Sequence, residues 1–98
     1  NECACKIFEP NPKHGKSKKG NANPEPTNPQ KGLDNSIEMP GNTTRRVGVD
    51  KEANENLVFD EHLPGKFHGH TRTWNELNQK MQAVLRKAGL VSKKGKIL

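Results

Sequence analysis

The most regular alternation of polar and apolar positions in this chain lies at residues 66–72, Lys-Phe-His-Gly-His-Thr-Arg. A β-strand directs successive side chains to opposite faces, so a strand here places Lys66, His68, His70 and Arg72 together. Two fixed cations and two imidazoles, which titrate near neutral pH, would lose water and crowd one another inside an apolar core. The pattern therefore predicts a surface that holds an anion, with phosphate as the candidate. A solvated edge strand without a function is the alternative.

Two further segments alternate in the same way before this strand. Residues 45–50 place two valines on one face, residues 57–60 place a leucine and a phenylalanine on one face, and short polar turns connect the segments. Such a series predicts an antiparallel meander over residues 45–72. The expected inward residues are Val47, Val49, Leu57, Phe59 and Phe67. The expected outward residues are Arg46, Lys66, His68, His70 and Arg72.

The last third of the chain has a helical period. Thr73 and Glu76 fit a capping box, and Gly89 fits the left-handed position that ends a helix. The apolar positions between them form one stripe: Leu77, Met81, Val84, Leu85 and Ala88. The pattern predicts a helix at residues 74–88 that packs on the inner face of the sheet, followed by a short hairpin arm. The fold class predicted is α+β, a small antiparallel sheet packed by a C-terminal helix.

Residues 1–27 have a different composition, rich in proline, glycine and lysine, and predict an extended basic arm. Lys13 and His14 in this arm are candidates to close over a bound phosphate backbone. The domain itself is expected at residues 28–98, beginning with a short helix capped by Asn28 and a short strand at residues 36–39.

Composition limits the function further. The 98 residues are only 29% hydrophobic, which predicts one small domain with a modest core. No apolar run approaches the roughly 20 residues that span a membrane. The net charge of +6 is unevenly spread: residues 34–64 carry seven acidic and three basic side chains, and residues 65–98 carry eight basic side chains against one glutamate. A cationic end of this kind favours a polyanionic partner such as nucleic acid.

The N-terminus carries the two cysteines, Cys3 and Cys5. One intervening residue makes a disulfide between them strained, and a metal site would need ligands beyond His14. Incidental thiols, or pairing with cysteines further upstream, are the remaining interpretations. The absence of an initiator Met and of a signal sequence leads us to expect a piece of a longer protein.

Metal-independent cleavage of RNA needs the residue types that the sheet face provides. Two imidazoles can remove the proton of the 2′-hydroxyl and protonate the leaving 5′-oxygen, while arginine and lysine stabilise the charged phosphorane. We therefore expect His70, His68 and Arg72 to be catalytic, with the assignment of base and acid left open. The residues expected to bind RNA phosphates are Lys66, Arg46, Lys13 and His14. Neither a metal nor another cofactor is expected.

Two other functions remain open from the residues alone. His-x-His on a strand presents two metal ligands side by side, and His62 or Asp60 could complete a set for a metal-dependent nuclease. The third class is a basic module that binds nucleic acid without cleaving it. Few aromatic residues alternate with basic ones, so binding of single strands by stacking is weakly supported.

Several blocks of the chain, in order, resemble the C-terminal toxin domains of bacterial polymorphic toxins, the variable tips of contact-dependent inhibition and Rhs-type proteins. The blocks are Asn11-Pro-Lys-His-Gly15, Arg45-Arg-Val-Gly-Val-Asp50, Val58-Phe-Asp60, Phe67-His-Gly-His-Thr-Arg-Thr-Trp74 and Leu85-Arg-Lys-Ala-Gly-Leu90. The strands and packed helix also resemble the barnase/EndoU/colicin/RelE-like nuclease fold.

The resemblance implies a ribonuclease toxin, with transfer RNA as the expected substrate. It also implies a carrier protein upstream of residue 1, secretion or display at the cell surface, and action in the cytoplasm of a target cell. A cognate immunity protein is implied, acidic where it covers a basic face. The site residues that lie in matching blocks are Lys13, His14, Arg46, His68, His70 and Arg72.

Overall fold

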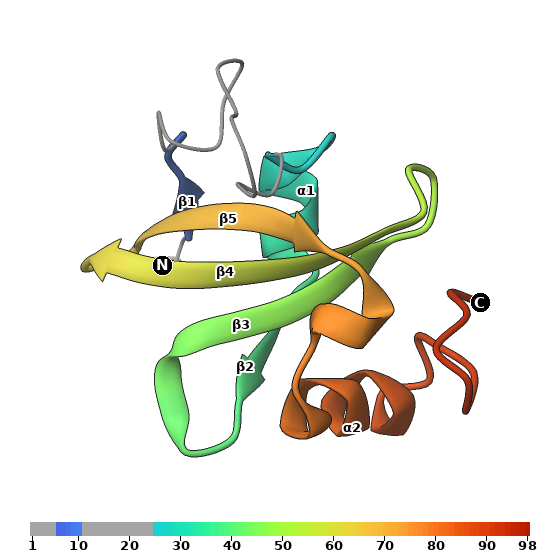
Figure 1. Ribbon diagram of the computed structural model, residues 1–98. Coiled ribbons are helices and arrows are strands. Elements are labelled where there is room, and N and C mark those ends of the chain that lie inside the picture. The colour runs from blue at the N-terminus through green and yellow to red at the C-terminus, as the bar shows by residue number, and fades with distance from the viewer. Residues whose placement is uncertain (1–5, 11–24) are drawn as a thin grey trace.

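A five-stranded sheet organises the protein, with one helix on each side of it (Figure 1). The computed structural model describes residues 6–10 and 25–98. In chain order the elements are β1 Ile7–Phe8, α1 Pro29–Asp34, β2 Ile37–Met39, β3 Asn42–Asp50, β4 Glu55–Leu63, β5 Lys66–Arg72, the 3-10 helix η2 Trp74–Glu76 and α2 Gln79–Lys87. The strand order is β1-β5-β4-β3-β2, an open sheet with two short edge strands. The predicted α+β class with a C-terminal helix is confirmed.

The predicted meander is also confirmed, because β3, β4 and β5 pair antiparallel in sequence. The sheet as a whole is mixed rather than antiparallel, since β1 runs parallel to β5. The amide of Ile7 donates to the carbonyl of Gly65 at 2.8 Å, and the amide of Glu9 donates to the carbonyl of Phe67 at 2.8 Å. Part of the stretch that the sequence presented as an arm is therefore built into the sheet, beside the strand with the two histidines.

Each face of the sheet has its own apolar core, and here the predicted inward set is wrong. Residues directly opposite in the register share a face, and Gly48 lies opposite Leu57 while Val47 lies opposite Val58. One core lies under α1 and contains Leu33, Leu57, Phe59 and Phe67. The other lies under α2 and contains Met39, Val47, Val58, Leu77, Met81, Leu85 and Val91. The alternation gave the faces within each strand correctly, but it could not give the register between strands, which decides the shared face.

The C-terminal helix begins later than predicted. Glu76 Oε1 accepts from the amide of Thr73 at 2.9 Å, as the predicted capping box requires, but this cap starts only the single turn of η2. The backbone is extended at Leu77, and Asn78 caps α2 by accepting from the amide of Met81 at 2.9 Å. Leu77, Met81, Val84 and Leu85 pack in the core as predicted, and Gly89 has the expected positive φ of +77°, but Ala88 is exposed and does not belong to the apolar stripe. Two consecutive caps thus divide the expected helix into two.

The remaining short elements agree with the sequence. The helix at α1 has Pro29 in its first turn, although the Asn28 side chain makes no cap and donates instead to Asp50 Oδ2 at 2.8 Å. The C-terminal arm folds back through an antiparallel bridge between Val91 and Ile97. Among the described residues, no helix is long and apolar enough to cross a membrane. Cys3 and Cys5 lie outside the described residues.

Candidate functional site

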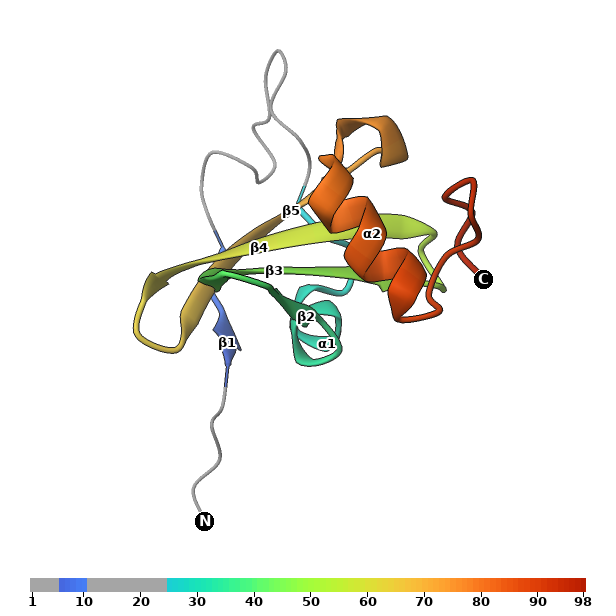
Figure 2. The same ribbon diagram turned by 90° about the horizontal axis from the view of Figure 1, so that it is seen from below.

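Strand β5 carries the polar row that the sequence predicted. Lys66, His68, His70 and Arg72 alternate along it and are all partly exposed, while Phe67 is buried on the other face. Figure 2 shows α2 lying across one half of the sheet, with no helix over the half that ends in the β4–β5 hairpin. The apolar core ends at Val58, which lies directly opposite His70. The end of the row with Lys66 and His68 therefore lies beyond the last residue of this core.

Gly69, between the two histidines, is required by the opposite face of the sheet. A Cβ at this position would lie 2.5 Å from Cδ1 and 2.6 Å from Cε1 of Phe59, closer than real contacts allow. Phe59 is fully buried and meets Phe8 edge-on, with ring centroids 6.5 Å apart. The glycine lets this aromatic ring pass against the backbone of β5. The packing of Phe59 against Gly69 on one face thus positions the backbone from which His68 and His70 extend on the opposite face.

A second polar row crosses the sheet at His68. Arg45 on β3 lies opposite Asp60 on β4, and Asp60 lies opposite His68 on β5. Arg45 Nε donates to Asp60 Oδ1 at 2.7 Å, in an ion pair about one-third exposed on the arginine side. Sequence reasoning missed Arg45, because only the register shows that it shares the face of the histidines.

The imidazole of His68 is held by two contacts. Its Nδ1 lies 2.9 Å from the main-chain oxygen of Glu9, and a carbonyl oxygen can only accept a hydrogen bond. The proton of neutral His68 therefore resides on Nδ1, which leaves Nε2 as the nitrogen that is unprotonated in the neutral ring. The ring also stacks on that of His62, with centroids 3.9 Å apart and planes 6° from parallel. These contacts fix both the tautomer and the orientation of His68.

The carboxylate of Glu9 joins the other groups at this end of the strand. Its Oε1 lies 2.9 Å from His62 Nε2, and its Oε2 lies 3.5 Å from Lys66 Nζ. Lys66 is therefore paired with an acidic partner, which lowers the net charge it offers to a phosphate. The alternation pattern showed neither Glu9 nor His62 in this role, since β1 reaches β5 through a parallel pairing that no local signal announces.

His70 and Arg72 form a separate pair at the other end of the row. Arg72 Nε donates to His70 Nε2 at 3.0 Å, and its Nη1 donates to the main-chain oxygen of Glu76 at 3.3 Å. Because a guanidinium only donates, His70 Nε2 carries a lone pair and no proton in this arrangement. A neutral imidazole beside a cation is the form that a general base needs.

The remaining predicted phosphate ligands do not join the row. Arg46 lies opposite Phe59 and so on the face covered by α1, contrary to its predicted place beside the histidines. Its guanidinium donates to Ser36 Oγ at 2.7 Å and to the main-chain oxygen of Ser36 at 2.6 Å, which ties β3 to the α1–β2 connection. The prediction failed for the same reason as the predicted core, an unknown register. Lys13 and His14 lie outside the described residues.

The ligand set proposed for a metal does not assemble around His68. Within residues 6–10 and 25–98, no three His, Cys, Asp or Glu side chains are placed to hold a metal ion. The stacked rings of His62 and His68 are parallel, so their nitrogens do not converge on one point. Arg45 occupies Oδ1 of Asp60.

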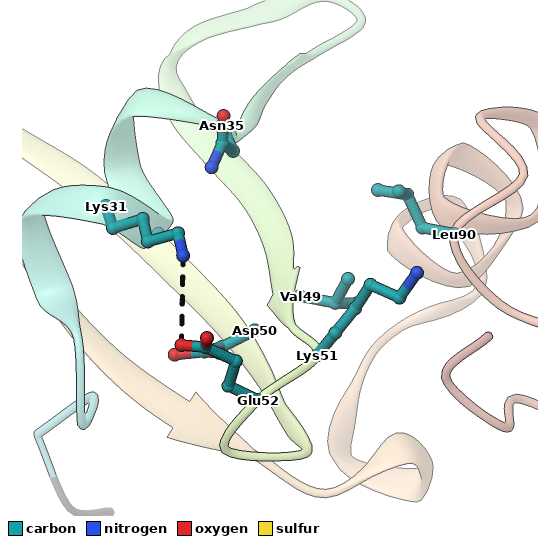
Figure 3. A pocket seen from close by; sticks show the side chains of 8 residues that line it. Lys31, Asn35, Val49, Asp50, Lys51, Glu52 and Leu90 are labelled. Carbon is teal, nitrogen blue, oxygen red and sulfur yellow. Dashed lines mark ion pairs between the residues drawn. The ribbon is translucent and has the colours of Figure 1, made fainter.

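A cavity of about 480 Å³ lies at the opposite end of β3 from Arg45 (Figure 3). It is lined by Lys31 and Lys51, by Asp50 and Glu52, and by apolar groups that include Val49 and Leu90. The hydrogen bond from Asn28, together with those from backbone amides, holds the pKa of Asp50 below its usual value. The two lysines are balanced by two carboxylates, and Lys31 pairs with Glu52 at 3.7 Å. This balance gives the cavity no preference for an anion.

Comparison with known proteins identifies the class of domain. The chain is similar to a solved structure from Cupriavidus taiwanensis LMG 19424, the crystal structure of a CDI (contact-dependent inhibition) complex, with 40% sequence identity and a TM-score of 0.71. The match covers 74% of this chain and 97% of the other. The chain belongs to the C-terminal toxin domains of bacterial contact-dependent inhibition systems. No protein-family model and no curated protein matches it.

Proposed function

We propose that this toxin domain is a metal-independent ribonuclease whose catalytic centre is the open end of the α2 face. The observation that carries the proposal is the row of His68, His70 and Arg72 on β5, three partly exposed side chains on one face of the sheet. Successive residues on one face of a strand lie roughly 6–7 Å apart. This separation suits a base and an acid acting on opposite sides of one phosphate.

The hydrogen bonds favour His70 as the general base and His68 as the general acid. His70 Nε2, which accepts from Arg72 Nε, carries the lone pair that takes the proton from the 2′-hydroxyl once Arg72 turns from the imidazole to the phosphate. His68, anchored through Nδ1, enters the reaction as the imidazolium, whose Nε2 proton it gives to the leaving 5′-oxygen. The attack forms a 2′,3′-cyclic phosphate and breaks the bond to the 5′-oxygen, so the proton leaves on one imidazole and arrives from the other.

Arg72 is the first candidate to stabilise the negative charge of the phosphorane. Its guanidinium has five donors in a fixed fork, and its 3.3 Å bond to the carbonyl of Glu76 is long enough to be given up for a phosphate oxygen. Lys66 and Arg45 lie on the same face and contribute positive potential, reduced by Glu9 and Asp60. Such preorganised cations act on charge that develops in the transition state.

The biological setting follows from the family. Delivery from the cell surface as part of a larger protein belongs to toxin domains of this class, and the site of action proposed is the target-cell cytoplasm, with transfer RNA as the substrate. The Cupriavidus structure is a complex, which supports a cognate immunity protein as the partner of this chain. Because residues 65–98 carry eight basic side chains against one glutamate, we expect that partner to be acidic where it binds them.

The test is cleavage of RNA by the purified domain in the presence of EDTA. His70→Ala and Arg72→Ala should each lose activity while keeping the thermal unfolding midpoint. Arg86→Ala is the matched control, since this exposed arginine on α2 contacts the ring of Trp74 and lies outside the row. Undiminished cleavage by both site variants removes the proposed centre. Loss of cleavage in EDTA with recovery in a divalent ion identifies a metal-dependent nuclease, and salt-sensitive binding without cleavage identifies a binding module.

A further inference from the structure

Asn56, at the start of β4, is a buried polar side chain without the partner that burial requires. Its residue is 8% exposed, and its Oδ1 is closed off from solvent with no hydrogen-bond partner among the described residues. Native proteins pair nearly all buried polar atoms, because an unpaired acceptor has lost water and gained nothing. In the register Asn56 lies directly opposite Arg72 on β5. The unpaired acceptor is therefore adjacent to the proposed catalytic row.

A cavity of about 360 Å³ opens beside this pair, lined by Asn56, Arg72 and their neighbours on β4, β5 and η2. Its volume is within the range of about 300–1,000 Å³ that small-molecule sites occupy. Two acidic residues line it, but their carboxylates already have partners. Glu55 accepts from the amide and hydroxyl of Thr27 at 3.0 and 2.6 Å, and Glu76 accepts from the amide of Thr73 at 2.9 Å.

The chemistry of the lining favours a neutral ring over an anion. The two carboxylates oppose a phosphate inside the cavity, whereas Arg72 at its edge suits a phosphate just outside. A primary amide has an oxygen that accepts and a nitrogen that donates, and this pair matches the edge of adenine, where an exocyclic amino group lies beside a ring nitrogen. A nucleobase inside the cavity, next to a phosphate bound outside it, fits the carboxylates, the guanidinium of Arg72 and the amide of Asn56.

We propose that this cavity binds the nucleobase beside the scissile phosphate, with Asn56 Oδ1 accepting an N–H of adenine. The inference rests on the proposed ribonuclease function and adds the base that the site selects. Because Oδ1 is closed to solvent, the base reaches it when a neighbouring side chain moves. Arg72 is the neighbour directly across the sheet, and binding of the phosphate draws its guanidinium away from Glu76. Phosphate binding and opening of the base site are thus coupled through one side chain.

The test uses short RNA oligonucleotides in which one ribose keeps its 2′-hydroxyl and all others are 2′-deoxy, with each of the four bases placed in turn on either side of that ribose. The wild-type domain should cleave the adenine-containing substrate roughly 5- to 150-fold faster, the discrimination that one bidentate amide–base contact gives. Asn56→Leu should lose this preference without a lower unfolding midpoint, because the substitution removes an unpaired buried acceptor. Asn75→Leu, an exposed asparagine outside the cavity, is the control and should keep the preference.

Each possible result supports or rejects the proposed base site. Cleavage by the wild type without base preference, or an unchanged preference in Asn56→Leu, overturns the base site while leaving the ribonuclease in place. A lower unfolding midpoint in Asn56→Leu together with a retained preference assigns the amide to structure alone. If the wild type cleaves nothing, the proposed function fails, and the cavity is then tested by NMR titration with the four 3′-nucleoside monophosphates. Shifts at Asn56 with adenosine 3′-monophosphate and not with the other three support the site, and no shift with any of them rejects it.

Discussion

The two faces of the sheet are covered to different extents, and the difference separates the closed apolar core from the proposed catalytic site. Under α1 the strands present a closed apolar core that includes Leu57 and Phe59, both fully buried. Under α2 the apolar core runs only as far as Val58, and Asp60 and His68 follow on the same face. Because α2 covers only part of this face, the uncovered part can carry polar side chains such as Asp60 and His68.

Strand β5 serves both faces at once through alternate residues. Phe67 and Gly69 lie on the face of the sheet covered by α1. His68 and His70 lie on the opposite face, which carries α2. Substitutions at neighbouring positions should therefore have opposite consequences, one for activity and the next for stability.

Replacement of His68 by alanine should reduce RNA cleavage about 10²- to 10⁴-fold, the usual contribution of a general acid or base. Its neighbour in the stack, His62, has no proton-transfer role in the proposed mechanism, so His62→Ala should cost far less activity. Initial rates on a defined RNA substrate measure both variants. An equal or larger loss in His62→Ala would reverse the assignment of the two rings.

On the other face, Phe59→Ala should lower the free energy of unfolding by about 3–5 kcal/mol, the range for removal of a large buried aromatic ring. In a domain of this size such a loss leaves little of the native state. Urea denaturation followed by tryptophan fluorescence, through Trp74, provides the measurement. A loss below about 1 kcal/mol would mean that the core under α1 does not determine stability.

Gly69→Ala links the two faces in one substitution. The added methyl group collides with the ring of Phe59, and such overpacking costs about 1–3 kcal/mol of stability. The strain is shared by β5, so activity should fall as well. The double variant Gly69→Ala/Phe59→Leu should recover part of both losses, whereas a Gly69→Ala protein of wild-type stability would contradict the close contact.

The smallest expected effect is at the remote end of β3. The pKa of Asp50 is lowered in the folded state, chiefly by the hydrogen bond from Asn28. Its carboxylate therefore stabilises the fold above the ordinary pKa of about 3.9, and this contribution disappears as the pH falls through the folded value. Asp50→Asn should cost about 1 kcal/mol at pH 7 and show a flatter loss of stability between pH 5 and 2. Parallel pH profiles for wild type and variant would contradict the assignment.

Local patterns in the sequence predicted most of the elements but not how they meet. Strand β5, the α2 stripe and the turns follow from alternation, helical period and glycine, all of which act over a few residues. The register between strands depends on the complete packed sheet, so Arg46 was predicted on the wrong face and Arg45 was missed. Glu9 could not have been placed at all, because residues 9 and 68 meet through the parallel pairing of a two-residue strand.

We propose that the imidazoles of His68 and His70 make the 2′-hydroxyl of RNA the nucleophile. The most direct measurement is the chemistry of the ends produced by the wild-type domain in EDTA. We expect a 2′,3′-cyclic phosphate and a 5′-hydroxyl, with no cleavage of a substrate whose reacting ribose is 2′-deoxy. A 5′-phosphate and a 3′-hydroxyl, or cleavage at the deoxy position, would contradict it.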